Sequence, residues 1–420
     1  MNRYLKIGLL LAASISLPSA VNGSQWSAEV GYESRIYQHS GPQGQAKIHP
    51  SLRFEGEYYK GWKDGLESFT FSPILVVDVQ DGERSHFDIR EFSWVHVDDG
   101  WELRGGIRTV FWGVMETRHL VDIINQTDQV MNLDGEDKLG QPMINLSIDQ
   151  SWGTLDFYLM SFFRDRTFIG PDGRLRGPLV VDVDNPKFES SNKRSRIEGA
   201  VRWHQYFGDF DIALSHFSGI GRAPTFELAG SVVGVTFVPN GLVTPVYAVV
   251  DQTGIEMQYM YEGWAFKLEA ISHYGHAGRY SATAFGFEFT QSGLYDTRLD
   301  LGWVVEYSYD GRDESAPVGV PEHDLTVATR WALNDVDASE ALLGVVVDSQ
   351  SDELVFFLEA SKRLGEYWKV YIESRIFVGG KPLPHDLVSV LAELSSPDSQ
   401  NKLGYLQDED FLRIEFVRYF

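Results

Sequence analysis

Cysteine is absent from the 420 residues of this chain, so neither a disulfide framework nor a lipid-anchoring cysteine is available. Long apolar runs are also lacking, because no stretch beyond the first 23 residues approaches the roughly 18 apolar residues of a membrane-spanning helix. Proline is sparse, and basic residues are few: 36 Lys and Arg stand against 60 Asp and Glu. The net charge of −24 argues against a nucleic-acid partner. Stability must therefore come from an ample core or from one large closed structure.

The start of the chain has the features of an export signal. A short basic segment precedes the apolar run IGLLLAASISL, and small residues follow it. This run is too short for a spanning helix, which needs about 20 residues. We predict a signal peptide over residues 1–23, cleaved after Ala20 or after Gly23, and a single mature unit over residues 24–420.

From residue 25 onward the chain alternates between apolar and polar residues in short segments separated by turn signals. In WAFKLEAISHY, for example, Trp264, Phe266 and Leu268 alternate with Lys267 and Glu269. A period of two residues is typical of a strand with one apolar face. About 18 such segments are present (16–18), starting near Trp26, Ala46, Phe69, Ser85, Trp101, Met143, Thr154, Arg194, Asp209, Val250, Ala265, Ser281, Asp296, His323, Glu340, Glu353, Tyr367 and Asp410.

The connections between these segments are sorted by length. Every second connection tends to be a tight turn, whereas long loops occupy alternate positions near 113–140, 164–193, 219–249, 310–322 and 378–408. A soluble β-sandwich gives no reason for this sorting, but an outer-membrane barrel does, with short periplasmic turns and long extracellular loops. The sequence predicts an all-β fold: a transmembrane antiparallel up-and-down β-barrel. The alternative is a soluble periplasmic β-protein.

The alternation has a consequence for the interior of such a barrel. A charge at mid-depth on the lipid face costs about 2–4 kcal/mol, so the charged face of nearly every strand must point inward. At 16–18 strands, side chains no longer fill the interior and an aqueous channel results.

The chain resembles Gram-negative outer-membrane porin-like barrels in its export signal, its alternating strands and its terminal FVRYF. In that group a C-terminal Phe closing an amphipathic strand is part of the signal read by the barrel-assembly machinery. The resemblance gives this role to Phe420, Phe416 and Ile414. Arg418 departs from the pattern, because an apolar residue or Tyr is usual at that position.

A narrower likeness covers about 30 residues, WELRGGIRTVFWGVMETRHLVDIINQTD. This segment looks like alginate-export-type and related outer-membrane barrels. The resemblance implies an export or uptake channel in the outer membrane, surrounded by lipid and lipopolysaccharide and passing a small hydrophilic solute.

The segment 113–140 is the best candidate for a loop folded into the pore, because it is long, mixes charge with apolar residues and follows a strand with inward charges. A solvated surface loop is the alternative. Inward arginines suit an anionic solute, although cross-strand ion pairs with inward carboxylates explain them as well. The candidate pore-lining and constriction residues are Glu102, Arg104, Arg108, Glu116, Arg118, Asp122, Arg90, Arg196, Arg202, Arg298, Arg330 and Arg375.

Other kinds of site find little support in the sequence. Asp134, Glu136 and Asp137 could attract a hard cation, but they lack the spacing of a calcium loop, so we predict no metal. No nucleophile–base motif is present, and we predict neither catalysis nor a cofactor. The segment 385–394 has helical periodicity within the last long loop.

These observations predict an outer-membrane channel for passive or substrate-selective diffusion of small hydrophilic solutes, anionic ones included, or for export of an acidic polysaccharide. The alternative is a barrel enzyme or an envelope-assembly protein without conductance. The sequence does not determine the oligomeric state, the solute or the direction of transport.

Overall fold

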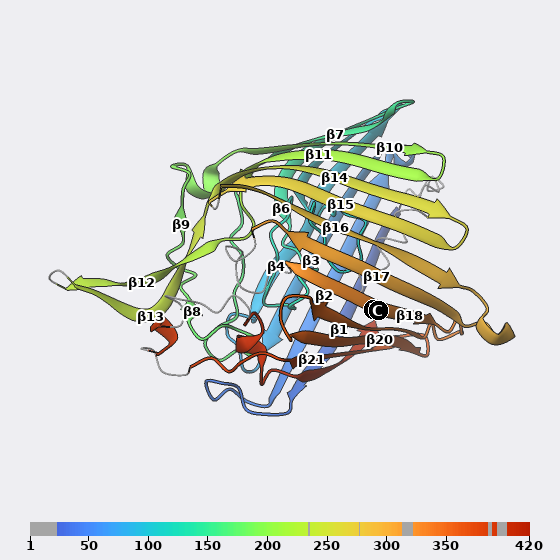
Figure 1. Cartoon of the computed structure of the whole chain (residues 1–420). Helices are drawn as coiled ribbons and strands as arrows, with labels where there is room; N and C mark the ends of the chain where they lie inside the picture. Colours follow the sequence, from blue (N-terminus) through green and yellow to red (C-terminus); the bar gives the residue numbers. More distant parts are fainter. Residues whose placement is uncertain (1–22, 234–235, 277, 313–321, 385–388, 393–400) are drawn as a thin grey trace.

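Strands of alternating character close on themselves into one barrel in the computed structural model, which describes residues 23–233, 236–276, 278–312, 322–384, 389–392 and 401–420 (Figure 1). The main sheet has 18 strands, each antiparallel to its neighbours. They are β1 (Gly23–Tyr37), β2 (Ile48–Trp62), β3 (Glu67–Asp78), β4 (His86–Asp98), β5 (Trp101–Arg108), β6 (Gln141–Gln150), β7 (Gly153–Met160), β10 (Glu198–Phe207), β11 (Phe210–Ile220), β14 (Val249–Tyr261), β15 (Trp264–Gly275), β16 (Gly278–Gln291), β17 (Asp300–Asp310), β18 (His323–Ala332), β19 (Glu340–Asp348), β20 (Leu354–Leu364), β21 (Trp368–Val378) and β22 (Phe411–Tyr419).

Closure is made by the first and last strands. β1 pairs with β2 on one side and with β22 on the other, in a register that runs from Glu29 opposite Tyr419 to Tyr37 opposite Phe411. All 18 predicted strands are present, and each predicted start lies within four residues of the observed one. Because the sheet closes, its backbone groups are paired inside the protein, as hydrocarbon surroundings require.

The two faces of the barrel differ as the alternation predicts. On β15, Phe266 faces outward and is 44% exposed, whereas Glu269 faces the interior and is fully buried. Aromatic side chains gather on the outer face at the short-turn end, where the rings of Trp26 and Tyr58 lie 4.5 Å apart and those of Trp264 and Phe289 lie 4.4 Å apart. An apolar outer band bordered by aromatic residues is typical of membrane-spanning barrels.

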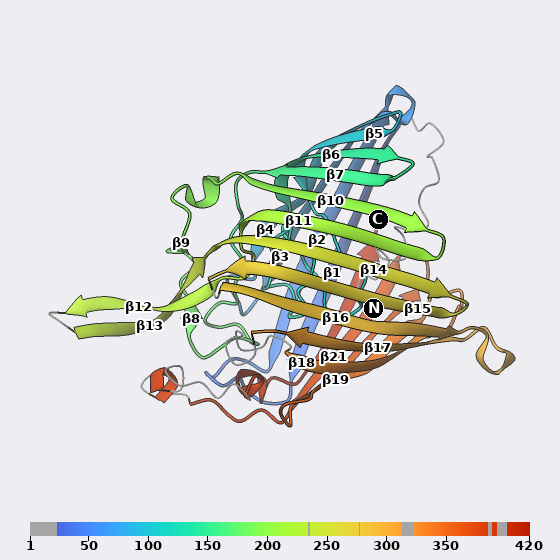
Figure 2. The ribbon, with the colours of Figure 1, turned by 45° about the horizontal axis from the view of Figure 1, so that its top comes forward.

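Connection length is sorted between the two ends of the barrel, as predicted. Two-residue turns such as 99–100, 151–152, 208–209 and 262–263 lie at one end. Longer connections gather at the other, including 109–140, 161–197, 221–248, 311–322 and 379–410, although the hairpin between β15 and β16 is short there too. Figure 2 shows the long connections together on the left of the barrel.

A second, four-stranded sheet lies outside the barrel wall. β12 (Thr225–Val233) and β13 (Thr236–Tyr247) form a hairpin, and β8 (Val180–Val181) and β9 (Lys187–Phe188) run parallel to β13. Both views show this hairpin projecting beyond the rim at the long-loop end (Figures 1 and 2). The sequence treated this region as a plain loop, and its hairpin was missed.

Short helices complete the described chain: η1 (Lys63–Gly65), η2 (Lys193–Ser195), η3 (Leu294–Asp296) and η5 (Gly404–Leu406). Of the predicted helical segment 385–394, residues 389–392 are helical and the others lie outside the described residues. Residues 1–22 of the predicted signal peptide also lie outside them. Within the described chain, no helix combines the length and the apolar character needed to cross a membrane.

Candidate functional site

The connection between β5 and β6, residues 109–140, turns into the barrel and is called the crossing loop here. It consists of two lobes: the first lobe spans residues 110–124 and the second lobe spans residues 126–138. Asn125 lies between them and is almost fully buried. Its Oδ1 accepts the N–H of Val110 at 2.8 Å, and its Nδ2 donates to the carbonyls of Arg108 and Leu139, both at 2.8 Å. This side chain therefore fastens the beginning of the loop to its end.

The first lobe is attached to carboxylates on the wall formed by β14, β15 and β17. Glu269 Oε1 accepts the backbone N–H groups of Val114 at 2.7 Å and Met115 at 3.0 Å. Glu306 accepts those of Glu116 at 2.6 Å and Thr117 at 2.9 Å. Carboxylate acceptors make stronger hydrogen bonds than neutral ones, so this attachment is firm.

Close approach at this wall depends on a glycine and on apolar packing. Gly113 has φ +134°, and a Cβ at this position would lie 2.8 Å from Glu269 Oε1. Trp112 packs edge-on against Tyr158 of β7, with ring centroids 5.6 Å apart. The buried cluster also contains Val121, Ile124, Met143, Met160 and Phe217. An apolar core therefore lies inside the barrel, between the first lobe and the wall.

The second lobe lies against the wall formed by β1, β3 and β4. Arg90 of β4 contacts Asp128 at 2.5 Å and donates to the carbonyl of Lys138 at 2.9 Å. Arg35 of β1 and Arg84 donate to the carbonyls of Met131 and Val130, at 2.5 and 3.0 Å. The stem of this lobe is a short antiparallel bridge between Thr127 and Lys138. The two lobes are therefore held against two different stretches of the barrel wall: the first against β14, β15 and β17, and the second against β1, β3 and β4.

The lobes are joined to each other by ion pairs. His119 of the first lobe lies 2.9 Å from Glu136 of the second, and Lys138 lies 3.0 Å from Asp122. Burial lowers the pKa of His119, but the hydrogen bond to Glu136 and the charges of Glu136, Glu269 and Asp122 together outweigh it and raise the pKa to about 9. The imidazolium is therefore the prevailing form at neutral pH, and the contact is a charged one.

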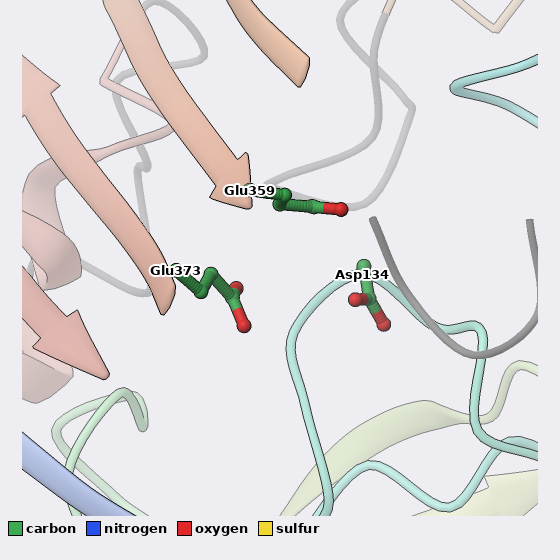
Figure 3. A group of neighbouring side chains, drawn as sticks. All are labelled: Asp134, Glu359 and Glu373. Carbon is green, nitrogen blue, oxygen red and sulfur yellow. The ribbon is translucent and has the colours of Figure 1, made fainter. Parts of the chain in front are cut away.

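The tip of the second lobe brings an acid against two others. The carboxylate oxygens of Asp134, Glu359 and Glu373 lie within 4.8 Å of one another (Figure 3). Arg375 contacts Glu359 at 2.8 Å and Glu373 at 3.2 Å, and Arg413 contacts Glu373 at 2.7 Å. Two guanidinium groups thus already face the carboxylates on the wall. Glu136 and Asp137, the other acids of the sequence cluster, are not members of this group.

Several predicted pore residues meet at the crossing loop. Glu116 pairs with Arg330 of β18 at 2.7 Å, and Arg118 lies 3.4 Å from Asp310 of β17. Arg202 of β10 contacts Glu256 at 2.9 Å. Arg90, Asp122 and Arg375 take part in the contacts described above. Each of these charged groups therefore lies inside the barrel, and most hold the crossing loop or its supporting wall.

The three predicted residues of β5 line the wall beside the loop. Arg104 forms an ion pair with Glu102 on its own strand. Arg108 donates to Asn145 Oδ1 at 3.1 Å and makes no ion pair with any residue that the structure describes. Arg104 and Arg108 lie on the same inward face of the strand; Arg104 is half-buried and Arg108 is buried, and the carboxylates of Glu91 and Asp156 are near enough to act on both guanidinium groups.

Two predicted pore residues lie elsewhere. Arg298 is exposed in the turn between β16 and β17, and Arg196 follows the short helix η2 outside the strands. The alternating pattern predicts strands that start at Arg194 and Asp296, and both arginines would then lie inside strands. In the structure β10 starts at Glu198 and β17 at Asp300, after these residues. The turn before β17 contains Tyr295 and Asp296 at positive φ, which a strand does not allow.

Sequence reasoning missed the role of the wall carboxylates. The sequence offers cross-strand ion pairs with arginines as one explanation of the inward carboxylates, whereas Glu269 and Glu306 accept hydrogen bonds from backbone N–H groups of the crossing loop. The partner, a loop more than 140 residues earlier, is not visible from the local pattern.

Outer loops are fixed above the crossing loop by buried arginines. Arg222 contacts Glu198 at 2.9 Å and donates to the carbonyl of Ile124 at 2.7 Å. Arg174 contacts Glu409 at 2.8 Å and lies 3.9 Å above the ring of Tyr37. These contacts join the loops 161–197, 221–248 and 379–410 to the crossing loop or to the barrel wall.

Solved structures resemble this architecture, whereas comparisons of the sequence find no match. No protein-family model matches the chain, and no curated protein sequence matches it. Among solved structures, a BenF-like porin from Pseudomonas fluorescens Pf-5 has a TM-score of 0.52 at 10% identity, covering 96% of this chain and 99% of that one. Pseudomonas aeruginosa OccD3 (OpdP) has a TM-score of 0.51 at 8% identity, covering 96% and 92%.

The fold is that of a porin-like barrel. The likeness covers nearly the whole chain and confirms the predicted class, a transmembrane antiparallel β-barrel. At identities this low it extends to the fold alone. The narrower resemblance to alginate-export-type barrels stays a prediction.

Proposed function

We propose that this protein is an outer-membrane channel through which small hydrophilic solutes diffuse. The observation that carries the proposal is a closed 18-strand barrel with an apolar outer face and a charged interior, crossed by a loop that is bonded to both walls. A charged interior is of no use to a barrel that only anchors itself in lipid. A loop fixed across it narrows the passage and places charges where a solute must go.

Small solutes fit this arrangement better than a polymer. The crossing loop reaches β15 and β17 on one side and β1 and β4 on the other, so a polysaccharide would have to pass a loop held at both ends. Export of an acidic polysaccharide, the alternative from the sequence, would require that this loop detach. We therefore propose diffusion of small solutes first.

Within this channel we propose that Arg104 and Arg108 form a station for anionic groups. The support is that Arg108 makes no ion pair among the described residues, while Asn145 and Tyr158 stand opposite each other on the neighbouring strands β6 and β7. A guanidinium without a carboxylate partner favours a solute carboxylate, which it can bind through two hydrogen bonds.

Planar-bilayer recordings test both parts. The folded wild-type protein is expected to carry ionic current, and its absence from correctly folded barrels would contradict the channel. The double variant Arg104→Gln/Arg108→Gln is expected to shift the reversal potential in a salt gradient toward cation selectivity. Arg279→Gln removes a charge from the outer face and is the matched control, expected to leave the reversal potential unchanged. An unchanged reversal potential in the double variant would exclude the anion station.

The C-terminal strand β22 bears on how the protein reaches its membrane. Phe416 and Ile414 belong to β22, Phe416 and Phe420 are well exposed to the surroundings, and Phe420 donates its N–H to the carbonyl of Ala28 at 2.9 Å. The guanidinium of Arg418, the departure from the usual pattern, lies 4.9 Å from the ring of Phe420. We propose that this end is presented to the barrel-assembly machinery, and that the finished barrel lies in the outer membrane among lipid and lipopolysaccharide.

A further inference from the structure

The outer face of the barrel changes character on β11, β14, β15 and β16, which lie side by side on the near wall in Figure 2. Toward the long-loop end, two successive rows of outward-facing side chains across these strands are polar. From β11 to β16, the lower row is His216, Thr253, Ser272 and Ser281, and the upper row, nearer the long loops, is Ser218, Asp251, Tyr274 and Arg279. These two rows are called the lateral patch.

The outer wall around the lateral patch is apolar. Val201 of β10 stands opposite His216, and Leu214, Ile255 and Ala270 continue the apolar band toward the short turns. On β1–β3, β18, β21 and β22, outward positions near the long-loop end carry exposed apolar side chains: Ile36, Ile48, Val77, Leu325, Ile376 and Leu412. The lateral patch is therefore a local exception on a wall that otherwise suits lipid tails.

The lower row lies at the depth of the lipid tails. A strand of an outer-membrane barrel needs about 9–11 residues to cross the hydrocarbon layer. Counted from the aromatic residue Trp264 at the short-turn end of β15, the strand leaves this layer near Tyr274, so Ser272 lies inside it. The same count from Phe289 on β16 leaves Ser281 inside. Lipid tails offer these polar groups no hydrogen bonds, so a lipid-covered wall gives no reason for them.

The lateral patch carries a base and an acid that balance each other. Arg279 Nη2 lies 2.8 Å from Asp251 Oδ1, and Arg279 Nη1 donates to Ser272 Oγ at 3.1 Å. The guanidinium also lies 5.5 Å from the centre of the Tyr274 ring. The side chains of Arg279 and Asp251 are 51% and 34% exposed, so the ion pair faces outward, where a second surface can reach both charges.

A balanced surface of this kind fits another protein surface better than a phosphorylated lipid. A phosphate would meet Asp251 beside the guanidinium that it needs, which is unfavourable. A second copy of the chain offers an acid to the base and a base to the acid. Asp251 on β14 and Arg279 on β16 flank β15, so a two-fold axis along the membrane normal beside β15 places Asp251 of each copy toward Arg279 of the other.

We propose that the outer face of β11, β14, β15 and β16 is the contact between two copies of this barrel, with the lateral patch of each copy covering that of the other. A two-fold contact uses the same patch on both copies and closes at two. The contact lies outside the barrel, so each copy keeps its own lumen and its own selectivity. The association of two copies does not depend on ionic current through either of them.

The absence of cysteine from the chain allows a cross-linking test in full-length, single-cysteine variants. Tyr274→Cys lies beside the two-fold axis, and a short bis-maleimide is expected to join it to itself in outer-membrane fragments, giving a covalent dimer on a denaturing gel. The matched control is Ile48→Cys, an exposed outward position of β2 on the opposite side of the closed sheet, which is expected to stay monomeric. No dimer from Tyr274→Cys, or as much dimer from Ile48→Cys, would overturn the proposal.

Charge substitutions test the two-fold pairing through the monomer–dimer equilibrium of the folded barrel in lipid-containing detergent. Asp251→Arg acts at two symmetric contacts, and at about tenfold for each we expect the dissociation constant to rise about 100-fold. The exchange Asp251→Arg/Arg279→Asp is expected to restore dimerisation, and Glu366→Arg, in the exposed turn between β20 and β21, is expected to leave it unchanged.

Heat-modifiable migration on a gel identifies the folded barrels to be compared. Undiminished dimerisation in folded Asp251→Arg, or no recovery in the folded exchange variant, would overturn the proposal. A wild-type protein that stays monomeric and retains a phosphorylated glycolipid, lost in Arg279→Gln, would overturn it in favour of a lipid site. A monomeric protein that conducts would overturn the dimer and leave the channel function standing, whereas a dimer without current would do the reverse.

Discussion

Glu269 is the wall residue whose removal should most clearly change the interior of the barrel. Its fully buried carboxylate accepts three backbone N–H groups of the first lobe: those of Val114 at 2.7 Å, Met115 at 3.0 Å and Val121 at 3.3 Å. Hydrogen bonds to a charged group contribute about 1.5–3 kcal/mol each. Counting the two shorter bonds, Glu269→Ala weakens the attachment of the first lobe by about 3–6 kcal/mol.

A loss of about 4 kcal/mol reduces the ratio of attached to detached lobe by about 1,000-fold, since 1.36 kcal/mol corresponds to a factor of ten. We expect Glu269→Ala to give larger and noisier single-channel currents, because the lobe no longer stays against the wall. The barrel itself should keep its heat-modifiable migration on a denaturing gel, since no strand pairing is touched. Glu269→Gln should be milder, because its carbonyl oxygen can still accept the N–H groups of Val114 and Met115.

The control for this prediction is Glu366→Ala, which removes the same charge from the exposed turn between β20 and β21. It should leave current and noise at wild-type values. If Glu269→Ala folds into the barrel and yet conducts like wild type and Glu366→Ala, the attachment of the first lobe does not limit the passage, and our assignment of the constriction is refuted.

Three further outcomes follow from the contacts of the loops. Asn125→Ala removes three neutral hydrogen bonds and should destabilise the closed form of the crossing loop by about 2–4 kcal/mol, seen as faster hydrogen exchange confined to residues 109–140. Arg174→Ala leaves Glu409 buried without its partner and should cost about 3–5 kcal/mol, seen as faster proteolysis of the outer loops in intact barrels. Protonated His119, held by Glu136, Glu269 and Asp122, should stabilise the joined lobes by about 3 kcal/mol below pH 6.5, because its pKa is raised to about 9. This contribution should be lost as the pH rises toward about 9, and His119→Gln should abolish the alkaline loss of exchange protection.

The barrel was predictable from the sequence because the residue pattern that specifies each strand lies within that strand. A strand between lipid and water repeats every two residues, so the pattern around Trp264, Phe266 and Glu269 fixes both the strand and its faces without knowledge of its neighbours. The final strand was identified in the same way. Strand starts were less certain, which is why Arg196 and Arg298 were placed inside strands that begin after them.

The fastening of the crossing loop was not predictable from local pattern. Trp112 reads like an aromatic residue of the membrane interface, but it is buried inside the barrel against Tyr158. Whether residues 109–140 turn inward depends on which carboxylates face them across the closed barrel, and Glu269 and Glu306 reach that position only through the register of all the intervening strands. Contacts that form only when the barrel closes can be identified only from the structure.

The most direct test of the account is current through a single purified, folded barrel in a planar bilayer. We expect discrete ionic steps for wild type, and larger, noisier steps when Glu269→Ala detaches the first lobe of the crossing loop from the wall. Folded barrels that carry no current, with the loop attached or detached, would contradict it.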